Sequence, residues 1–189
     1  MDGDISPQDK ITHLKKKYNA IFVLDDAHGL GVVGDGSGST SLFNKVEVDI
    51  CIGTLSKSIG SYGGFVSGKK TLIDFLINRC RTQIYTTGLP PAVLAASTKA
   101  IDIIENSPNL IRKPLENAKF FSKLLNLKTP HSPIVPIILK KEQKVIEACK
   151  LLEKNGYLVG GIRPPTVPVN TSRLRLAFNS SHTKKNITA

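Results

Sequence analysis

Two short, largely apolar runs constrain the fold of this chain more than any other feature. The first run, Ala20 to Leu24, ends in Asp25 and Asp26, and the second, "VDICIG", leads into a loop that carries Lys57. Continuous apolar runs of this length are typical of strands in a parallel sheet, because helices cover both of its faces. Segments with helical spacing lie before and after the two runs. The pattern therefore predicts an α/β fold with a mostly parallel sheet.

Helices are predicted where apolar residues recur every three or four positions, and strands where short apolar runs lie between turns. The predicted helices cover residues 7–18 with Ser6 as the N-cap, 69–83, a segment starting at Pro90, about 110–127 and about 142–155. The later strands are "GGFVSG", "IVPIIL", 157–159 and "RLRLAF". The turn signal "NSPN" at residues 106–109 marks a candidate domain boundary.

Composition excludes several classes of protein. None of the apolar runs approaches the roughly 20 residues that span a bilayer, and the acidic, polar N-terminus is unlike a signal peptide. The three cysteines, Cys51, Cys80 and Cys149, lie far apart, which favours a reducing cytoplasm over a disulfide framework. The net charge of +11 is spread along the 189 residues without a long basic run. A lysine-rich surface explains this charge better than nucleic-acid binding does.

Polar residues follow both apolar runs at the point where each predicted strand ends. Asp25 and His28 follow the first strand, and Thr54 and Lys57 follow the second. Ligands of open α/β sheets bind outside the carboxyl ends of the strands. A capping aspartate, a surface histidine and a solvated loop lysine are the alternative readings. A metal site would need further ligands, which no nearby cysteine or second histidine supplies.

Pyridoxal phosphate would explain these residues together. The coenzyme needs a lysine for a Schiff base, an acid facing its pyridine nitrogen, and donors for its phosphate. The corresponding hypothesis assigns Lys57 to the Schiff base, Asp25 to the ring nitrogen, His28 to the phenolic oxygen and Thr54 to the phosphate.

A third segment, "RPPTVPVNTSRLRL", holds a proline-rich loop next to an arginine-bearing strand. Arg175 could bind a carboxylate through both arms of its guanidinium group. The alternative is an edge strand with alternating charged residues, of which Arg173 could be one.

The segments "DDAHGLGVVG", "GTLSKSIGSYGGFVSG", "TTGLPPAVLAA" and "IRPPTVPVNTSRLRL" together resemble the α-oxoamine synthase family of fold-type I pyridoxal-phosphate enzymes. The resemblance implies that residues 1–105 are the C-terminal part of the large coenzyme domain and that 106–189 are a small α+β domain whose final helix is truncated. It also implies that Thr166 contacts substrate and that Arg175 binds a carboxylate. Thr86 and Thr87 match a segment that approaches the phosphate of the partner subunit in a homodimer.

The motifs agree best with family members that condense L-alanine with pimeloyl-CoA or a pimeloyl-acyl carrier protein, with loss of carbon dioxide, in biotin synthesis. The family's N-terminal half, with its coenzyme-stacking histidine and phosphate loop, has no counterpart here, so the chain alone is expected to be inactive. Another α-oxoamine synthase, such as a glycine C-acetyltransferase or 5-aminolevulinate synthase, is one alternative. A non-catalytic remnant and a basic nucleic-acid-binding module are the others.

Overall fold

The computed structural model describes residues 1–189, which form two compact units. The N-terminal unit comprises Ser6–Arg112, and the C-terminal unit comprises Lys113–Ala189 together with Met1–Ile5. The boundary predicted after residue 105 falls at the end of helix α4 (Pro91–Asn106), whereas the two compact units divide inside helix α5 (Pro108–Leu124). The division lies beside Pro114, which has no N–H to donate within the helix. The assignment of the units to a large and a small domain stays a prediction.

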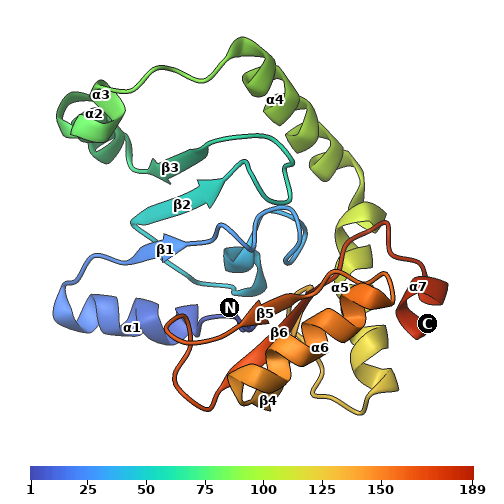
Figure 1. Cartoon of the computed structure of the whole chain (residues 1–189). Coiled ribbons are helices and arrows are strands. Elements are labelled where there is room, and N and C mark those ends of the chain that lie inside the picture. Colours follow the sequence, from blue (N-terminus) through green and yellow to red (C-terminus); the bar gives the residue numbers. More distant parts are fainter. The chain divides into compact units, whose positions relative to one another are not determined.

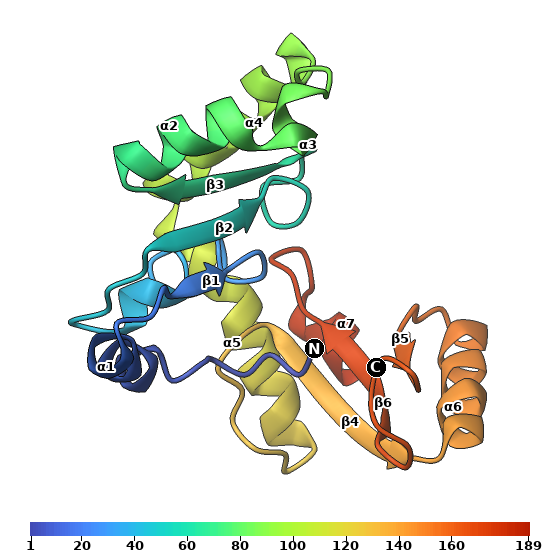
Figure 2. The same cartoon turned by 90° about the vertical axis from the view of Figure 1, so that its left-hand side faces the viewer.

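The N-terminal unit contains a three-stranded sheet in the order β1 (Val23–Asp25), β2 (Ile50–Thr54), β3 (Gly64–Gly68), and Figure 2 shows the three strands side by side. β1 and β2 are parallel, whereas β2 and β3 are antiparallel. The α/β class is confirmed, but the expectation of a mostly parallel sheet holds for only one of the two strand pairs in this unit. The loop between β2 and β3 is too short for the crossover that a parallel strand requires.

The first apolar run is buried on one side only. The side chains of Phe22 and Leu24 are each 7 % exposed, whereas Ile21 and Val23 are 73 % and 50 % exposed. Successive side chains of a strand point to opposite faces, so the run divides between a covered and an open face of the sheet. The sequence predicted burial on both faces of the sheet, but the elements of this chain bury only the face that carries Phe22 and Leu24.

Helices account for most of the remaining N-terminal unit. Figure 1 shows their order along the chain, with a 3-10 turn, η1 (Ser39–Leu42), between β1 and β2. The helix predicted over 69–83 is divided at Cys80, whose backbone is extended. The first helix begins one residue later than predicted, with Pro7 rather than Ser6 at the cap position. The helices are α1 (Gln8–Tyr18), α2 (Lys70–Arg79), α3 (Arg81–Ile84) and α4, which begins with a proline at its first position as predicted.

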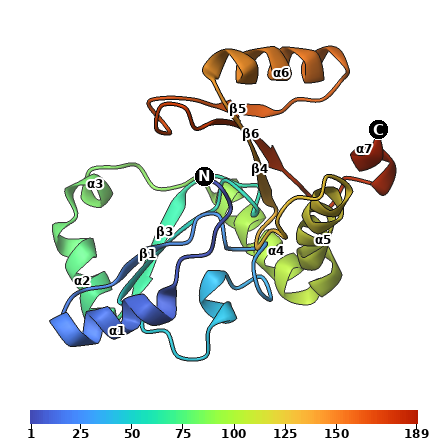
Figure 3. The ribbon, with the colours of Figure 1, turned by 90° about the horizontal axis from the view of Figure 1, so that it is seen from below.

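The C-terminal unit is an antiparallel sheet with a helix across one face. The strand order is β4 (Ile134–Lys140), β6 (Ser172–Ala177), β5 (Gly160–Ile162), and Figure 3 shows α6 (Glu142–Lys154) lying across β5 and β6. A Cβ atom at Gly161 would lie 2.9 Å from both Cys149 Sγ and a Val145 methyl group, so the helix approaches the strand backbone closely. The strand predicted at 157–159 begins at Gly160 instead. The short helix α7 (Lys184–Thr188) follows a capping box at Thr183.

The central position of β6 corrects one reading of the sequence. Arg173 was considered as a charged residue of an edge strand, but β6 pairs on both sides, with β4 and with β5. Arg173 is 8 % exposed and forms an ion pair with Asp2. A buried arginine needs such a partner, because its charge loses the solvation that water provides.

None of the helices has the length and apolar character needed to cross a membrane.

Asp49 joins α1 to the sheet, and its removal should weaken the N-terminal unit in a pH-dependent way. Its carboxylate accepts from Lys15 Nζ at 2.8 Å and from the Phe22 backbone N–H at 2.8 Å. The hydrogen bond from Lys15, followed by that from Phe22, lowers the pKa of Asp49 below its ordinary value of 3.8. A depressed folded-state pKa gives stability that is present above the ordinary value and lost as the pH falls below it.

We expect Asp49→Asn to lower the Tm by a few degrees at neutral pH, with the difference from the unaltered chain closing as the pH falls below 3.8. Circular dichroism melts over a pH series would measure this. The control is Asp74→Asn, which removes an exposed pair with Lys70 inside α2 and should change the Tm little. A pH-independent loss in Asp49→Asn would contradict the linkage.

Candidate functional site

Asp25 lies at the carboxyl end of β1 with its side chain exposed. It is in register with Ile52, so it shares a sheet face with Ile52 and Thr54. Its Oδ1 accepts a hydrogen bond from the Ala27 N–H at 3.0 Å. The carboxylate is exposed at this edge of the sheet. Asp25 can therefore present a negative charge to a ligand at this edge of the sheet.

Asp26 is occupied by the glycine-rich loop that follows β1. Its Oδ2 accepts from the Ser39 N–H at 2.7 Å, and its backbone oxygen accepts from the Gly29 N–H at 2.9 Å. Cβ atoms built at Gly29 and Gly38 would lie 2.1 and 2.2 Å from its carboxylate oxygens, so both positions require glycine. The structure thus gives the two adjacent acids different roles, since Asp25 is open and Asp26 holds the loop.

Lys57 lies in the loop that joins β2 to β3, and its side chain is exposed. The loop closes through hydrogen bonds from Leu55 N to Gly63 O (2.9 Å) and from Ser61 N to Leu55 O (2.8 Å). Leu55 and Ile59, on either side of the lysine, are 9 % and 5 % exposed. Buried flanking residues therefore fix the loop while the lysine stays available.

The loops after β1 and β2 touch one another. Ser58 Oγ donates to the backbone oxygen of Leu30, and a Cβ atom at Gly31 (φ +77°) would lie 2.7 Å from Ser58 Oγ. Because β1 and β2 are parallel, their carboxyl ends meet at the same edge of the sheet. The structure therefore brings together the loops that carry His28 and Lys57, beside Asp25 and Thr54.

Thr54 already has a hydrogen bond within this site. Its Oγ1 donates to Gly63 O at 3.1 Å and lies 2.8 Å from Ser56 Oγ. The hydroxyl would have to turn away from Gly63 in order to donate to a phosphate oxygen. Ser56, which is exposed, is a second hydroxyl at the same place.

Thr86 and Thr87 are exposed in the connection between α3 and α4. Neither forms a hydrogen bond with the Lys57 loop or with Asp25. Their role at the phosphate site of a partner subunit stays a prediction.

Thr166 and Arg175 belong to the C-terminal unit, whereas the residues above belong to the N-terminal unit. Arg175 lies on the central strand β6, half-buried, and its Nε donates to the Met1 backbone oxygen at 3.1 Å. Thr166 is exposed in the loop before β6, and its N–H donates to Arg163 O at 3.0 Å. Each residue is thus available to a ligand within its own unit.

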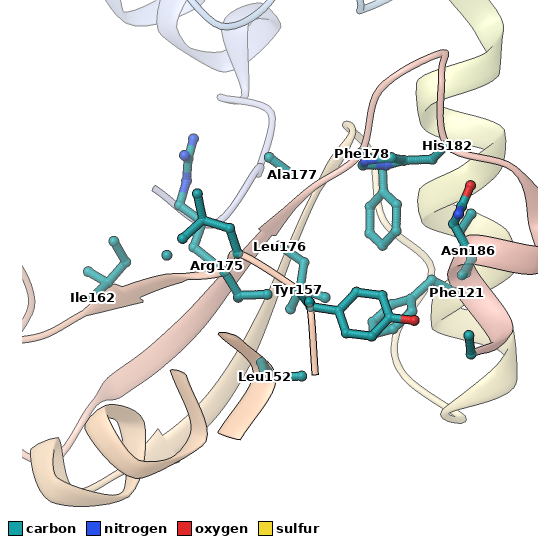
Figure 4. A pocket seen from close by; sticks show the side chains of 16 residues that line it. Phe121, Leu152, Tyr157, Ile162, Arg175, Leu176, Ala177, Phe178, His182 and Asn186 are labelled. Atoms are coloured by element: carbon teal, nitrogen blue, oxygen red, sulfur yellow. The ribbon is translucent and has the colours of Figure 1, made fainter. Parts of the chain in front are cut away.

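A hollow of about 820 Å³ lies in the C-terminal unit, and Figure 4 shows the side chains that line it. Its wall is mostly apolar, with Phe121, Leu176 and Phe178, and the polar groups are those of Tyr157, His182, Asn186 and Arg175. The stem of Arg175 adjoins this hollow, while its Nε is bonded to Met1.

Sequence reasoning missed three contributors to these sites. Asp2 was not singled out, because the residue it pairs with, Arg173, is 171 positions away. Gln8, which is fully buried, donates to Ser39 Oγ at 2.6 Å and so ties α1 to the loop that Asp26 holds.

Cys51 lies in β2, where burial, and then the charge of Asp26, raises the pKa of its thiol. The thiol is therefore kept protonated and is a poor nucleophile. None of these contacts has a local sequence signal.

The aminotransferase class I and II family matches residues 1–189. The chain belongs to this family. A putative 8-amino-7-oxononanoate synthase from Caulobacter vibrioides (strain NA1000 / CB15N) is 44 % identical over 182 residues, which are 96 % of this chain and 47 % of the relative. The 8-amino-7-oxononanoate synthase of Beijerinckia indica subsp. indica is 45 % identical over 188 residues, 99 % of this chain and 49 % of the relative. The chain thus spans about half the length of the curated relatives it matches.

Among solved structures, a serine palmitoyltransferase variant from S. paucimobilis with bound PLP–myriocin aldimine superimposes with a TM-score of 0.91. It is 29 % identical, and the match covers 100 % of this chain and 50 % of that one. This aminotransferase-family chain therefore has the fold of part of a pyridoxal-phosphate enzyme. The family membership and fold expected from the motifs are confirmed.

Proposed function

We propose that this chain provides the lysine, acid and arginine of an 8-amino-7-oxononanoate synthase, which condenses L-alanine with a pimeloyl thioester and releases carbon dioxide. The observation that carries the proposal is the arrangement at the carboxyl ends of β1 and β2. An open aspartate and an exposed lysine lie on two adjoining parallel strands, and their loops are linked by Ser58. This is the combination that pyridoxal phosphate requires of a protein.

The residues present fit the coenzyme. The exposed carboxylate of Asp25 suits a protonated ring nitrogen, and the Thr54 and Ser56 hydroxyls suit a phosphate. His28, exposed in the loop after β1, suits the phenolic oxygen. When bound, pyridoxal phosphate supplies an electron sink that stabilises negative charge on the substrate carbon. Lys57 Nζ would attach the coenzyme and then remove the proton from the α-carbon of the amino acid.

Thr166 and Arg175 would bind the substrate in the same enzyme. The guanidinium group of Arg175 suits the carboxylate of the amino acid, since arginine and carboxylate form paired hydrogen bonds. Thr166 would add a hydroxyl contact. The acyl donor would be pimeloyl-CoA or a pimeloyl-acyl carrier protein, and Thr86 and Thr87 would approach the phosphate of a second subunit in a homodimer. The cytoplasm is the proposed compartment, because the three cysteines are unpaired.

The relatives favour this reaction over that of other α-oxoamine synthases. Identity is 44–45 % to two 8-amino-7-oxononanoate synthases and 29 % to the serine palmitoyltransferase. The fold alone does not choose between these chemistries, because one fold hosts many reactions.

The chain alone is expected to show no steady turnover. The chain spans about half the length of the matched relatives. The apolar side chains of Ile21 and Val23, just before and at the start of β1, are also exposed. Phe22 and Leu24 of the same apolar run are buried. Open apolar strand faces promote aggregation or the binding of a partner.

The test uses the chain alone and the chain co-expressed with the part of the Beijerinckia relative that it does not match, called the assembled enzyme below. Each is incubated with pyridoxal phosphate, L-alanine and pimeloyl-CoA, and released thiol is followed. We expect turnover and the visible absorbance of bound coenzyme from the assembled enzyme only. Steady turnover by the chain alone would show that the missing part is dispensable, and a well-folded assembly that binds no coenzyme would refute the proposed function.

A further inference from the structure

We propose that Asp2 is a positioning residue for Arg175, which it orients through the Met1 peptide and through Arg173. This inference rests on the proposed role of Arg175 in binding the substrate carboxylate. All four residues belong to the C-terminal unit, although Met1 and Asp2 are separated from the two arginines by most of the chain.

Arg173 is the buried partner that holds Asp2. Its Nη1 donates to Asp2 Oδ2, and the side chains of Arg173 and Asp2 are 10 % and 31 % exposed. Its Nε donates to the Thr171 backbone oxygen at 2.9 Å, at the end of the loop that carries Thr166. Two directed donors fix this guanidinium group, and a largely buried charged pair is screened little by water. Asp2 is therefore anchored to the central strand of the sheet.

Gly3 fixes the other side of the same peptide segment. Its backbone has φ +77°, and a Cβ atom there would lie 2.3 Å from Ser132 Oγ and 2.7 Å from Ile134 O. The segment thus lies directly against the start of β4, where any side chain at position 3 would collide with the backbone. Between these two anchors, the Met1 carbonyl is directed at Arg175.

The Met1 carbonyl accepts from Arg175 Nε at 3.1 Å. A guanidinium group has five N–H donors, and this contact uses the one on Nε. The two Nη groups remain, and together they form the end of the fork that can grip both oxygens of a carboxylate. Arg173 and Arg175 project from the same face of β6, because they are two residues apart. Asp2 neutralises Arg173, so Arg175 is the arginine left to receive the substrate anion.

The test compares the affinity for L-alanine with that for L-alaninamide, which lacks the carboxylate, by isothermal titration of the coenzyme-loaded assembled enzyme. Asp2→Asn keeps the size of the side chain and removes its charge. We expect the ratio of the affinities for L-alanine and L-alaninamide to fall about tenfold in this variant, which corresponds to weakening one charge-assisted contact. The matched control is Asp4→Asn, an exposed acid two residues along the same segment, which should keep the preference. Asp2→Glu should restore part of it.

The outcomes separate this inference from the proposed function. Arg175→Lys should abolish the preference, and if it does not, the proposed role of Arg175 fails and the inference fails with it. If Arg175→Lys abolishes the preference but Asp2→Asn retains it, only the positioning role is overturned. Equal losses of affinity for both ligands in Asp2→Asn would show a general structural effect and would also overturn it.

A second measurement uses the chain alone. Hydrogen exchange followed by mass spectrometry should show faster exchange of the amides of residues 2–5 in Asp2→Asn than in Asp4→Asn, while the strands of the C-terminal unit keep their protection. Unchanged exchange in residues 2–5 would contradict the anchoring of Met1 by Asp2.

Discussion

Replacing Lys57 with alanine is expected to abolish covalent attachment of the coenzyme in the assembled enzyme and to cost at least roughly 10²–10⁴-fold in rate from the lost proton transfer alone. The fold should survive, because the buried residues that hold the loop are Leu55 and Ile59, and Lys57 itself is exposed. Borohydride reduction of the unaltered enzyme followed by peptide mapping should place the coenzyme on Lys57.

The control for this experiment is Lys70→Ala. Lys70 is a nearby lysine at the start of α2, where it pairs with Asp74 on the surface. This variant should retain the coenzyme and most of the rate. Labelling at Lys69 or Lys70, with Lys57 untouched, would show that the coenzyme is attached elsewhere and would remove the basis for the proposed function.

Changing Asp25 to asparagine should have the second-largest effect, a fall in kcat of about 10²-fold or more, because a charged partner of the reacting coenzyme is removed from a preorganised site. The absorbance spectrum of the bound coenzyme should also shift, since the protonation of the ring nitrogen depends on that charge. Both are measured on the assembled enzyme with L-alanine and pimeloyl-CoA.

Asp26→Asn is the matched control, since it changes the adjacent residue in the same way. The carboxylate of Asp26 is bonded to the Ser39 N–H and packed against Gly29 and Gly38. Its replacement should therefore lower the Tm and loosen the loop while changing kcat less than Asp25→Asn does. Equal losses of kcat in the two variants, with no change in the coenzyme spectrum of Asp25→Asn, would show that Asp25 does not face the ring.

Asp25 and Asp26 show what a local sequence pattern can predict and what it cannot. Alternation along a strand indicates that only one of two adjacent residues can face a ligand, and the family motif selected Asp25. The structure adds what Asp26 does instead, because its partners lie in a loop whose course depends on η1 and on Gln8 in α1.

Helix ends and strand positions were predictable where the residues carry the signal themselves. Pro91 begins α4, and the apolar spacing over 142–155 matches α6 closely. The break in the helix at Cys80 was not predictable, because no proline marks it. The start of β5 at Gly160 was not predictable either, because the glycines at 160 and 161 favour no particular secondary structure. There, packing against neighbouring elements decides the backbone.

The sequence by itself determined the α/β class, the two strand ends that carry Asp25 and Lys57, and the family to which the chain belongs, because each depends on residues close together in the chain. Tertiary structure alone decided that β6 is central with a buried Arg173, and that Asp2 meets that arginine across most of the chain. The physical reason is that strand order and ion-pair partners depend on which surfaces become buried together, and burial joins residues whose separation in sequence leaves no local pattern.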